Sequence, residues 1–326
     1  MTHDLDTEHL QVFAEAAAVE HGMPGAAITL LNVSENATYR IDATDGRCIV
    51  VRVHRTGYHS EDAIRSELTW VRSLREEGVV ATPPVVPTPD GREVVTVRHP
   101  DGEQRQVVAF EWMDGVHPPE DRLVDDFTQL GAITARLHRH AQHWQRPAGF
   151  TRFTWDYDTS LGERGHWGRW QDGLGVGPAE LDVLGRCAEL LRRRLEAFGR
   201  GPDRFGLVHA DMRLANLLVD GDSVGVIDFD DCGFSWYLYD LGSSLSFIEH
   251  LPIVPDLIDA WVTGYRAVAP LGPAEVAELP TFVMLRRLLL VSWVGSHSAV
   301  PEAVALGPEF TAVSCDLAEH YLSTFG

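Results

Sequence analysis

Apolar residues recur at helical spacing over residues 8–21, and a glycine follows them. This pattern predicts a leading helix that ends at the glycine. Two stretches with strand-like composition come next, AAITLLNVSENATYRID and CIVVRVHR, and the turn signal Asp45-Gly46 lies between them. These stretches predict a hairpin followed by a third strand.

A second helix is predicted for residues 61–77, where Ile64, Leu68, Val71 and Leu74 form one apolar stripe. The proline-rich segment ATPPVVPTPDG ends that helix. Two further strand candidates follow, REVVTVRH and QVVAFEWM. Residues 27–113 are therefore expected to have the order β-β-β-α-β-β, a small and mostly antiparallel sheet with one helix.

The pattern changes at Asp114, after which long helical segments predominate. Two short strand pairs, around LVHA and NLLVDGDSVGVIDF, interrupt these segments. The chain is expected to be of the α+β class, with a small antiparallel β-rich N-lobe over residues 1–113 and a larger helical C-lobe over residues 114–326. Within the second region we predict helices over residues 121–143, 178–199, 236–249, 253–268, 275–296 and 309–323.

Composition narrows the class of protein. The chain has 326 residues, and 44% of them are hydrophobic, which is enough for a core in each of two lobes. No window approaches the roughly 18 apolar residues of a membrane span, and the acidic start MTHDLDTEHL is unlike a signal peptide. The formal charge of −21 argues against binding nucleic acid. We therefore expect a cytoplasmic protein that binds neither nucleic acid nor membrane. Its scattered cysteines indicate no zinc site and no disulfide framework.

Chemically active side chains are densest in HADMRLANLLVDGDSVGVIDFDD, residues 209–231. A turn at Asp220-Gly221 is expected to fold the chain back, so that Asp228 lies beside Asp211. Phosphoryl transfer needs a carboxylate that orients the attacking hydroxyl, and it needs oxygen ligands for Mg²⁺. Asp211, Asn216 and Asp228 supply that set.

HADMRLAN resembles the HxDxxxxN catalytic loop of aminoglycoside phosphotransferase and choline kinase-like enzymes, and IDFD resembles their counterpart of the protein-kinase DFG segment. The resemblance implies a bilobal protein-kinase-like fold and transfer of the γ-phosphoryl group of ATP to a hydroxyl, with Mg²⁺ as cofactor. It makes Asp211 the catalytic base, and Asn216 and Asp228 the metal ligands. His209 and Asp240 would then support the catalytic loop.

The resemblance also implies a basic residue on the third strand, paired with a glutamate on the next helix. Arg52 and Glu67 stand at those positions, where relatives usually have a lysine in place of the arginine. The chain has 27 arginines and no lysine, and a guanidinium can bind phosphate or carboxylate through two hydrogen bonds. Strand alternation sends Arg52 and His54 to the face opposite Val51 and Val53. The alternative is that Arg52 is solvated and lies away from Glu67.

The chain contains neither GxGxxG nor GxxxxGK[ST]. Instead, LNVSENATYRI resembles the phosphate loop of the family, so Ser34, Asn36 and the backbone of residues 35–38 are expected to donate hydrogen bonds to phosphate oxygens. AFEWMDG fits the hinge that contacts adenine, which implies main-chain contacts from Glu111 and Met113. An ordinary turn and a plain strand end are the alternatives for these two segments.

Acidic side chains are expected near the acceptor, namely Asp230, Asp231 and Glu249. They would suit an amine-bearing alcohol, such as an aminoglycoside, an amino alcohol or an amino acid. SENATYR and WYLYDL resemble homoserine kinase-like enzymes, and MLRRLLLVSWVGSH resembles a bacterial stress response kinase. A Ser/Thr protein kinase of the same fold and a non-catalytic nucleotide-binding regulator are the alternative functions.

Two conspicuous features are interpreted as structural. His138, His140 and His143 do not share one helix face, so the sequence favours a solvated helix end over a metal site. The tryptophans of FTWDYD and RGHWGRW are predicted to take part in core or lobe packing rather than to stack on a ligand.

Overall fold

The computed structural model describes residues 6–34, 36–119, 122–221 and 223–326. The chain forms two compact units. Unit 1 comprises Met1–Val116, Arg146–Arg152 and Leu218–Asp230, and unit 2 comprises His117–Gln145, Phe153–Leu217 and Asp231–Gly326. Each unit is therefore assembled from segments that are discontinuous in the sequence.

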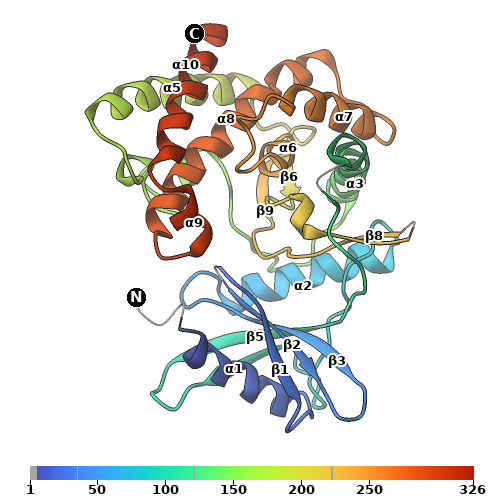
Figure 1. The fold of residues 1–326 in the computed structure, drawn as a ribbon. Coiled ribbons are helices and arrows are strands. Elements are labelled where there is room, and N and C mark those ends of the chain that lie inside the picture. Colours follow the sequence, from blue (N-terminus) through green and yellow to red (C-terminus); the bar gives the residue numbers. More distant parts are fainter. Residues whose placement is uncertain (1–5, 35, 120–121, 222) are drawn as a thin grey trace. The chain divides into compact units, whose positions relative to one another are not determined.

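A five-stranded sheet forms the centre of unit 1 (Figure 1). Its strands follow the order β1-β2-β3-β5-β4, and all neighbours are antiparallel, which confirms the predicted β-rich antiparallel region. A separate hairpin pairs β7 with β8. The strands are β1 (Ala27–Val33), β2 (Ala37–Asp42), β3 (Cys48–Val53), β4 (Val94–Arg98), β5 (Gln104–Glu111), β7 (Leu217–Asp220) and β8 (Ser223–Val226).

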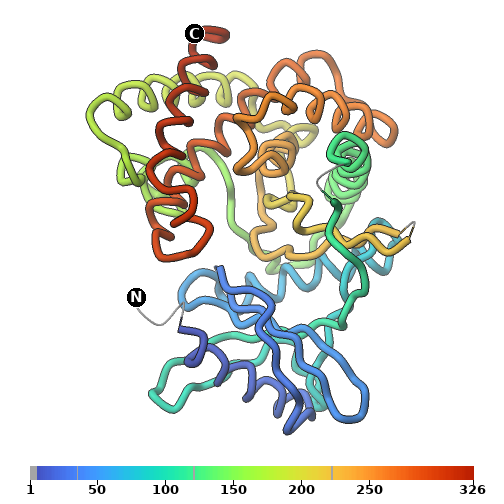
Figure 2. Tube along the Cα trace, in the orientation of Figure 1, coloured from blue at the N-terminus to red at the C-terminus, as the bar shows by residue number. Residues whose placement is uncertain are grey.

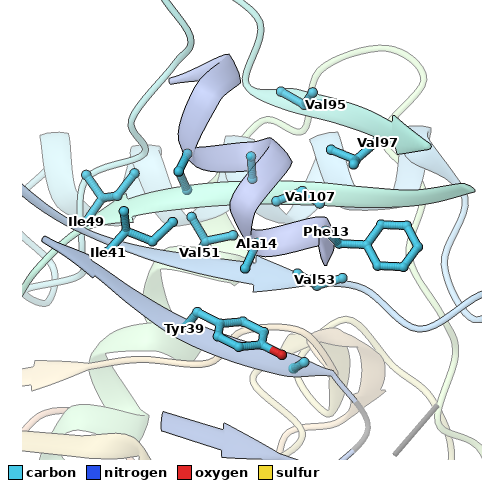
Figure 3. Packing of buried hydrophobic residues seen from close by; sticks show 14 of the residues in the cluster. Phe13, Ala14, Tyr39, Ile41, Ile49, Val51, Val53, Val95, Val97 and Val107 are labelled. Carbon is cyan, nitrogen blue, oxygen red and sulfur yellow. The ribbon is translucent and has the colours of Figure 1, made fainter. Parts of the chain in front are cut away.

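Each face of the five-stranded sheet packs against a helix. On one face, Val51 and Val53 of β3 join Phe13 of α1 (Thr7–Glu20) in a buried cluster (Figure 3). On the other face, Ile64 and Leu68 of α2 (Glu61–Glu76) pack with valines of β4 and β5. Arg52 of β3 points to the α2 side, where it bonds Glu67 of α2. This is the orientation that the alternation of side chains along β3 predicts.

Unit 2 is mostly helical, as the sequence predicts, and one two-stranded sheet of β6 (Phe205–Val208) and β9 (Gly233–Trp236) accompanies the helices. Helices α3 and α7 run side by side in Figures 1 and 2, although more than a hundred residues separate them in the sequence. The helices are α3 (Leu123–His143), α4 (Tyr157–Ser160), α5 (Pro178–Phe198), α6 (Tyr239–Ser244), α7 (Val254–Arg266), α8 (Pro273–Ser296), α9 (Pro301–Leu306) and α10 (Glu309–Phe325).

Helix α8 is long and apolar enough to pass a length-and-composition test for a membrane span. However, 78% of its most apolar window is buried inside the protein. It also carries Arg286 and Arg287, whose side chains are almost completely buried in hydrogen-bonded contacts. Helix α8 is therefore a buried core helix of unit 2.

The helix predicted over residues 236–249 is wrong at both ends. Trp236 still belongs to β9, and α6 ends at Ser244. The hydroxyls of Ser243, Ser244 and Ser246 each donate to a carbonyl three residues earlier, and such bonds compete with the helical ladder. Phe247 then adopts a φ of 73°, which no helix tolerates.

Candidate active site

The loop that follows β6 is fixed by Asp240, at the start of α6. The Oδ1 atom of Asp240 accepts a hydrogen bond from the backbone N–H of Ala210 at 2.7 Å, and Oδ2 accepts one from the N–H of His209 at 3.3 Å. Both carboxyl oxygens therefore hold a loop whose Ala210 has a left-handed φ of 68°. His209 is fully buried, and its Nδ1 lies 3.3 Å from the backbone nitrogen of Asp211.

His138 is a further part of this support that the sequence interpretation missed. Its Nε2 lies 2.8 Å from Oδ2 of Asp240, and its ring is only 1% exposed. The prediction of a solvated helix end is therefore wrong for His138 and also for His140, which is buried, whereas His143 is exposed. The helical spacing could have predicted this burial, because His138 stands four residues after the buried Thr134 and so lies on the same inward face of α3.

Asp211 has hydrogen-bond donors on both carboxyl oxygens. Asn216 donates from Nδ2 to Oδ2 at 2.9 Å and to the Asp211 carbonyl at 2.8 Å, and Arg286 donates from Nη2 to Oδ1 at 2.8 Å. The Nε of Arg213 lies 3.4 Å from Oδ2. Burial raises the pKa of Asp211, but the charges of Arg213 and Arg286 outweigh it and hold this pKa below its ordinary value. The sequence interpretation identified neither arginine.

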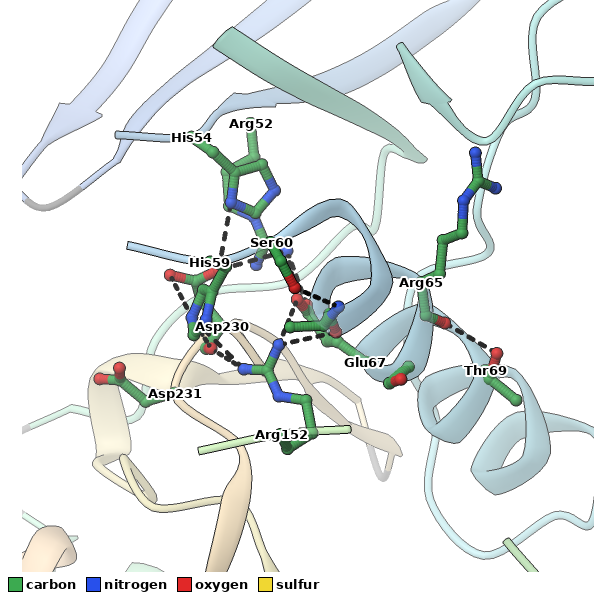
Figure 4. A network of polar contacts seen from close by, with 12 residues as sticks. Arg52, His54, His59, Ser60, Arg65, Glu67, Thr69, Arg152, Asp230 and Asp231 are labelled. Carbon is green, nitrogen blue, oxygen red and sulfur yellow. Dashed lines mark hydrogen bonds and ion pairs between the residues drawn. The ribbon is translucent and has the colours of Figure 1, made fainter. Parts of the chain in front are cut away.

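In unit 1, Arg52 and Glu67 form a buried ion pair (Figure 4). Nη2 of Arg52 donates to Oε1 and Oε2 of Glu67 at 2.6 and 2.8 Å, and the two residues are 5% and 1% exposed. Nη1 of Arg52 lies 3.5 Å from Oδ1 of Asp228. Burial lowers the pKa of Arg52, but Glu67, Asp230 and Asp228 together raise it above its ordinary value. Arg52 is therefore permanently charged and turned away from solvent.

Asp230 lies in the same buried network rather than on an open surface. Its Oδ2 accepts from Nδ2 of Asn36 at 2.7 Å, and its carbonyl accepts a hydrogen bond from Arg152. Burial raises the pKa of Asp230, but the charges of Arg52 and the neighbouring groups lower it well below its usual range. Arg152 is a second residue that the sequence interpretation missed; it also donates to the carbonyl of Ala63 at 2.9 Å.

Hydrogen bonds within unit 1 already engage the polar groups of Asn36 and Ser34 in the predicted phosphate loop. Asn36 uses its amide nitrogen on Asp230, and its Oδ1 accepts from the backbone N–H of Arg55 at 3.1 Å. The backbone nitrogen of Ser34 donates to the carbonyl of Asn36 at 3.2 Å. Glu35, whose backbone is part of the prediction, lies outside the described residues. Contact of this loop with phosphate stays a prediction.

The predicted hinge overlaps the end of β5, whose last residue is Glu111, and continues to Gly115. The backbone N–H of Glu111 donates to the carbonyl of Pro84 at 2.8 Å, so this donor is already bound within unit 1. The side chain of Met113 lies close to Gly225, where a Cβ would stand 2.2 Å from the Met113 Cε. Contact of these main chains with adenine also stays a prediction.

The two predicted metal ligands have suitable chemistry. The side chain of Asp228 is 52% exposed, and its φ of 59° is unusual for a residue other than glycine. Asn216 commits its amide nitrogen to Asp211, so its amide oxygen is the atom that could ligate a metal. Carboxylate and amide oxygens are the ligands that Mg²⁺ prefers, and these residues therefore fit that ion. Asp228 belongs to unit 1 and Asp211 to unit 2, so their closeness stays a prediction.

The remaining acidic candidates belong to unit 2. Asp231 is half-buried, and its carbonyl accepts from Nε1 of Trp155 at 2.8 Å. Glu249 is buried and accepts from Nη1 of Arg287 at 2.8 Å. Trp155 is completely buried, and so nearly are Trp167 and Trp170, in agreement with their predicted packing in the core.

Comparison with known proteins decides the family. The family model described as "Phosphotransferase enzyme family" matches residues 28–279, about three-quarters of the chain. The chain belongs to the phosphotransferase enzyme family. The solved structure of a microcompartment-associated aminopropanol kinase is 48% identical to it, with a TM-score of 0.90, and the match covers 97% of this chain and 98% of that one.

Two more distant relatives are also kinases, in agreement with the family match. The amicoumacin kinase of Bacillus subtilis (strain 168) is 27% identical over 292 residues, which cover 86% of this chain and 83% of that protein. A solved amicoumacin kinase in complex with AMP-PNP, Ca²⁺ and Ami has a TM-score of 0.78 at 23% identity, over 94% of this chain and 93% of that one, and it shows the shared fold. The chain is thus a kinase of this phosphotransferase family, with the α+β kinase-like fold that the sequence predicts.

Proposed function

We propose that this protein transfers the γ-phosphoryl group of ATP to the hydroxyl of a small amino alcohol, with Asp211 as the catalytic carboxylate. The observation that carries the proposal is the environment of Asp211, a carboxylate that Asn216 and Arg286 hold in one orientation. Phosphoryl transfer needs such a fixed carboxylate to orient the acceptor hydroxyl and to take its proton.

The acceptor class follows from relatives and from charge. A kinase that is 48% identical over nearly the whole chain is named for aminopropanol, which carries an amine close to its hydroxyl. An ammonium group needs a carboxylate partner, and the half-buried Asp231 is the candidate in unit 2. Asp230 is a weaker candidate, because Asn36 and buried arginines already engage its carboxyl and carbonyl groups.

Arg52 is proposed to bind the nucleotide phosphates in place of the usual lysine. Glu67 fixes its guanidinium through Nη2, while Nη1 extends toward Asp228. A guanidinium held on one side in this way can offer its remaining N–H groups to phosphate oxygens. The predicted contacts of Ser34, Asn36, Glu111 and Met113 complete the proposed nucleotide site, most of it in residues 1–113.

Mg²⁺ is the proposed metal, with Asn216 and Asp228 as its ligands. When bound, Mg²⁺ supplies the positive charge that neutralises the triphosphate. The acceptor is proposed to bind in the helical region, residues 114–326. We expect a cytoplasmic enzyme.

The test measures ADP release with 1-amino-2-propanol and, as a matched control that lacks the amine, 1,2-propanediol. We expect turnover of the amine that exceeds turnover of the diol by about 100-fold or more, since the diol lacks the ammonium group, and a hydrogen bond between charged groups contributes about 1.5–3 kcal/mol. Equal turnover of the two alcohols would overturn the acceptor class.

The role of Asp211 is tested separately. Asp211→Asn is expected to keep the fold and ATP binding while kcat falls by about 10²-fold or more, because positioned acid-base groups contribute about that much. Asp316→Asn is the control, since Asp316 is exposed on α10. An Asp211→Asn variant with the kcat of the control would remove Asp211 from the mechanism.

A further inference from the structure

Arg286 of α8 contacts two consecutive residues of the loop that carries Asp211. Its Nη2 donates to Oδ1 of Asp211 at 2.8 Å, and its Nη1 lies 3.3 Å from the carbonyl oxygen of Ala210. The same guanidinium donates to Oη of Tyr239 at 3.1 Å and to Oγ of Ser246 at 2.9 Å. Since Arg286 is only 3% exposed, these four contacts hold its planar head in one orientation.

The loop needs support at this point because Ala210 has a φ of 68°. Such a left-handed conformation is costly for a residue with a Cβ, and it persists only where neighbouring groups fix it. Asp240 binds the N–H of Ala210, and Arg286 binds its carbonyl oxygen. The two polar groups of this residue are thus held from two different helices.

The side chain of Asp211 is fixed in the same way. Asn216 holds Oδ2 from within the loop, and Arg286 holds Oδ1 from α8. A carboxylate with a donor on each oxygen has little freedom to rotate, and its remaining lone pairs point in fixed directions. Removing one of the two donors would allow the carboxyl group to rotate.

We propose that Arg286 is a positioning residue for phosphoryl transfer: its guanidinium orients the Asp211 carboxylate toward the acceptor hydroxyl and keeps the Ala210-Asp211 backbone in place. This inference rests on the proposed role of Asp211. Arg286 itself acts only through Asp211 and need not touch the substrate.

The neighbouring Arg287 provides a control within the same helix. It is equally buried, and it donates to Oε2 of Glu249 at 2.8 Å, to Oγ of Ser314 at 2.6 Å and to the carbonyl of Phe310 at 3.0 Å. These partners lie outside the loop that carries Asp211. Arg287 therefore has the packing and hydrogen bonding of Arg286 without its contact to Asp211.

A double-mutant cycle in the full-length enzyme tests the inference, with Arg286→Met, Asp211→Asn and the variant that combines them. We expect Arg286→Met to lower kcat by about 10- to 100-fold, the range typical of residues that orient an active-site group, while the KM values for ATP and the alcohol change less than about threefold. In the Asp211→Asn background the same substitution should lower kcat by less than about twofold, because the group it positions is already disabled.

Conservative substitutions keep the test informative if Arg286→Met does not fold. Arg286→Lys retains the charge but cannot span Asp211 and Ala210 with a planar fork, so its kcat should fall by about 5-fold or more. The matched Arg287→Lys should keep at least about half of the kcat of the unmodified enzyme. The Arg286→Lys substitution can replace Arg286→Met in the cycle.

The outcomes separate the two proposals. A normal kcat for Asp211→Asn would reject the proposed catalytic role of that residue. A low kcat for Asp211→Asn, together with a full further loss when Arg286 is replaced, would overturn only the positioning role, because Arg286 would then act independently of Asp211. A normal kcat for Arg286→Lys or Arg286→Met would also overturn the positioning role of Arg286.

Discussion

Replacing His138 by alanine is expected to destabilise unit 2 because it removes a buried partner of Asp240. The Nε2–H of His138 can donate to Oδ2 of Asp240 at 2.8 Å, while its Nδ1 accepts from the hydroxyl of Tyr265 at 3.1 Å. A neutral imidazole satisfies both contacts at once. The ring also packs near the aromatic rings of Tyr237 and Tyr265, whose centroids are 4.8 and 5.7 Å away.

The magnitude follows from what the substitution leaves behind. A hydrogen bond to a charged group contributes about 1.5–3 kcal/mol, and a small cavity adds about 1 kcal/mol. Asp240 keeps its bonds to the N–H groups of Ala210 and His209, which limits the cost of its burial. We therefore expect the free energy of unfolding to fall by about 2–4 kcal/mol. Tyr265→Phe removes only one neutral hydrogen bond and should cost about 1 kcal/mol.

Urea unfolding followed by tryptophan fluorescence is a suitable assay, since most of the tryptophans belong to unit 2. His143→Ala is the matched control, because His143 is an exposed histidine in the last turn of the same helix, and its loss should change the free energy of unfolding by less than about 0.5 kcal/mol. A loss below about 1 kcal/mol for His138→Ala, or equal losses for the two variants, would refute the reasoning.

Two further predictions concern helix packing and pH. Gly131→Ala should destabilise unit 2 by more than about 2 kcal/mol, because the new Cβ would lie 2.1 Å from the carbonyl oxygen of Trp261. The control Gly185→Ala, whose new Cβ would have its nearest neighbour 3.9 Å away, should instead stabilise α5 by about 0.5–1 kcal/mol. Thermal unfolding of both variants checks this prediction, and equal shifts of the melting temperature would contradict it. Burial lowers the pKa of His59 from 6.5 to about 4, so the unfolded chain binds more protons than the folded one between these values. The contribution of His59 to the free energy of unfolding of unit 1 should therefore be intact above about pH 6.5 and fall by up to about 3 kcal/mol as the pH drops to 4. If His59→Gln unfolds with the same pH dependence as the unmodified protein, His59 is not the group responsible.

Much of the candidate site was accessible from sequence because its residues are close together in the chain or stand at fixed strand and helix positions. Asp211 and Asn216 lie five residues apart, and one short loop brings them into hydrogen-bonding contact. Arg52 and Glu67 meet because strand alternation and the stripe of α2 turn both toward the same side of the sheet. The sequence gives no such signal for Arg286, which stands 75 residues from Asp211. Arg287 is the next residue in the same apolar stretch, so the sequence does not show which of the two arginines meets Asp211.

The prediction for His138 failed for a related reason. A polar residue at the end of an amphipathic helix is usually solvated, and only a partner elsewhere in the chain makes its burial favourable. That partner, Asp240, lies 102 residues away. The prediction for residues 236–249 failed locally, because serine hydroxyls that bond to the backbone shorten α6 and the pairing of β9 with β6 extends the strand.

The sequence by itself determined the order of strands and helices in residues 27–113, a family resemblance and the residues of the loop around Asp211, since all of these depend on periodicity and on residues that are near in the chain. Only the tertiary structure decided which partner each buried charged group meets: Arg286 with Asp211, His138 with Asp240, and Arg152 with the backbone of Asp230. The physical reason is that a charge is stable in the interior only beside a partner, and the packing of helices and strands, rather than any local pattern, brings such partners together.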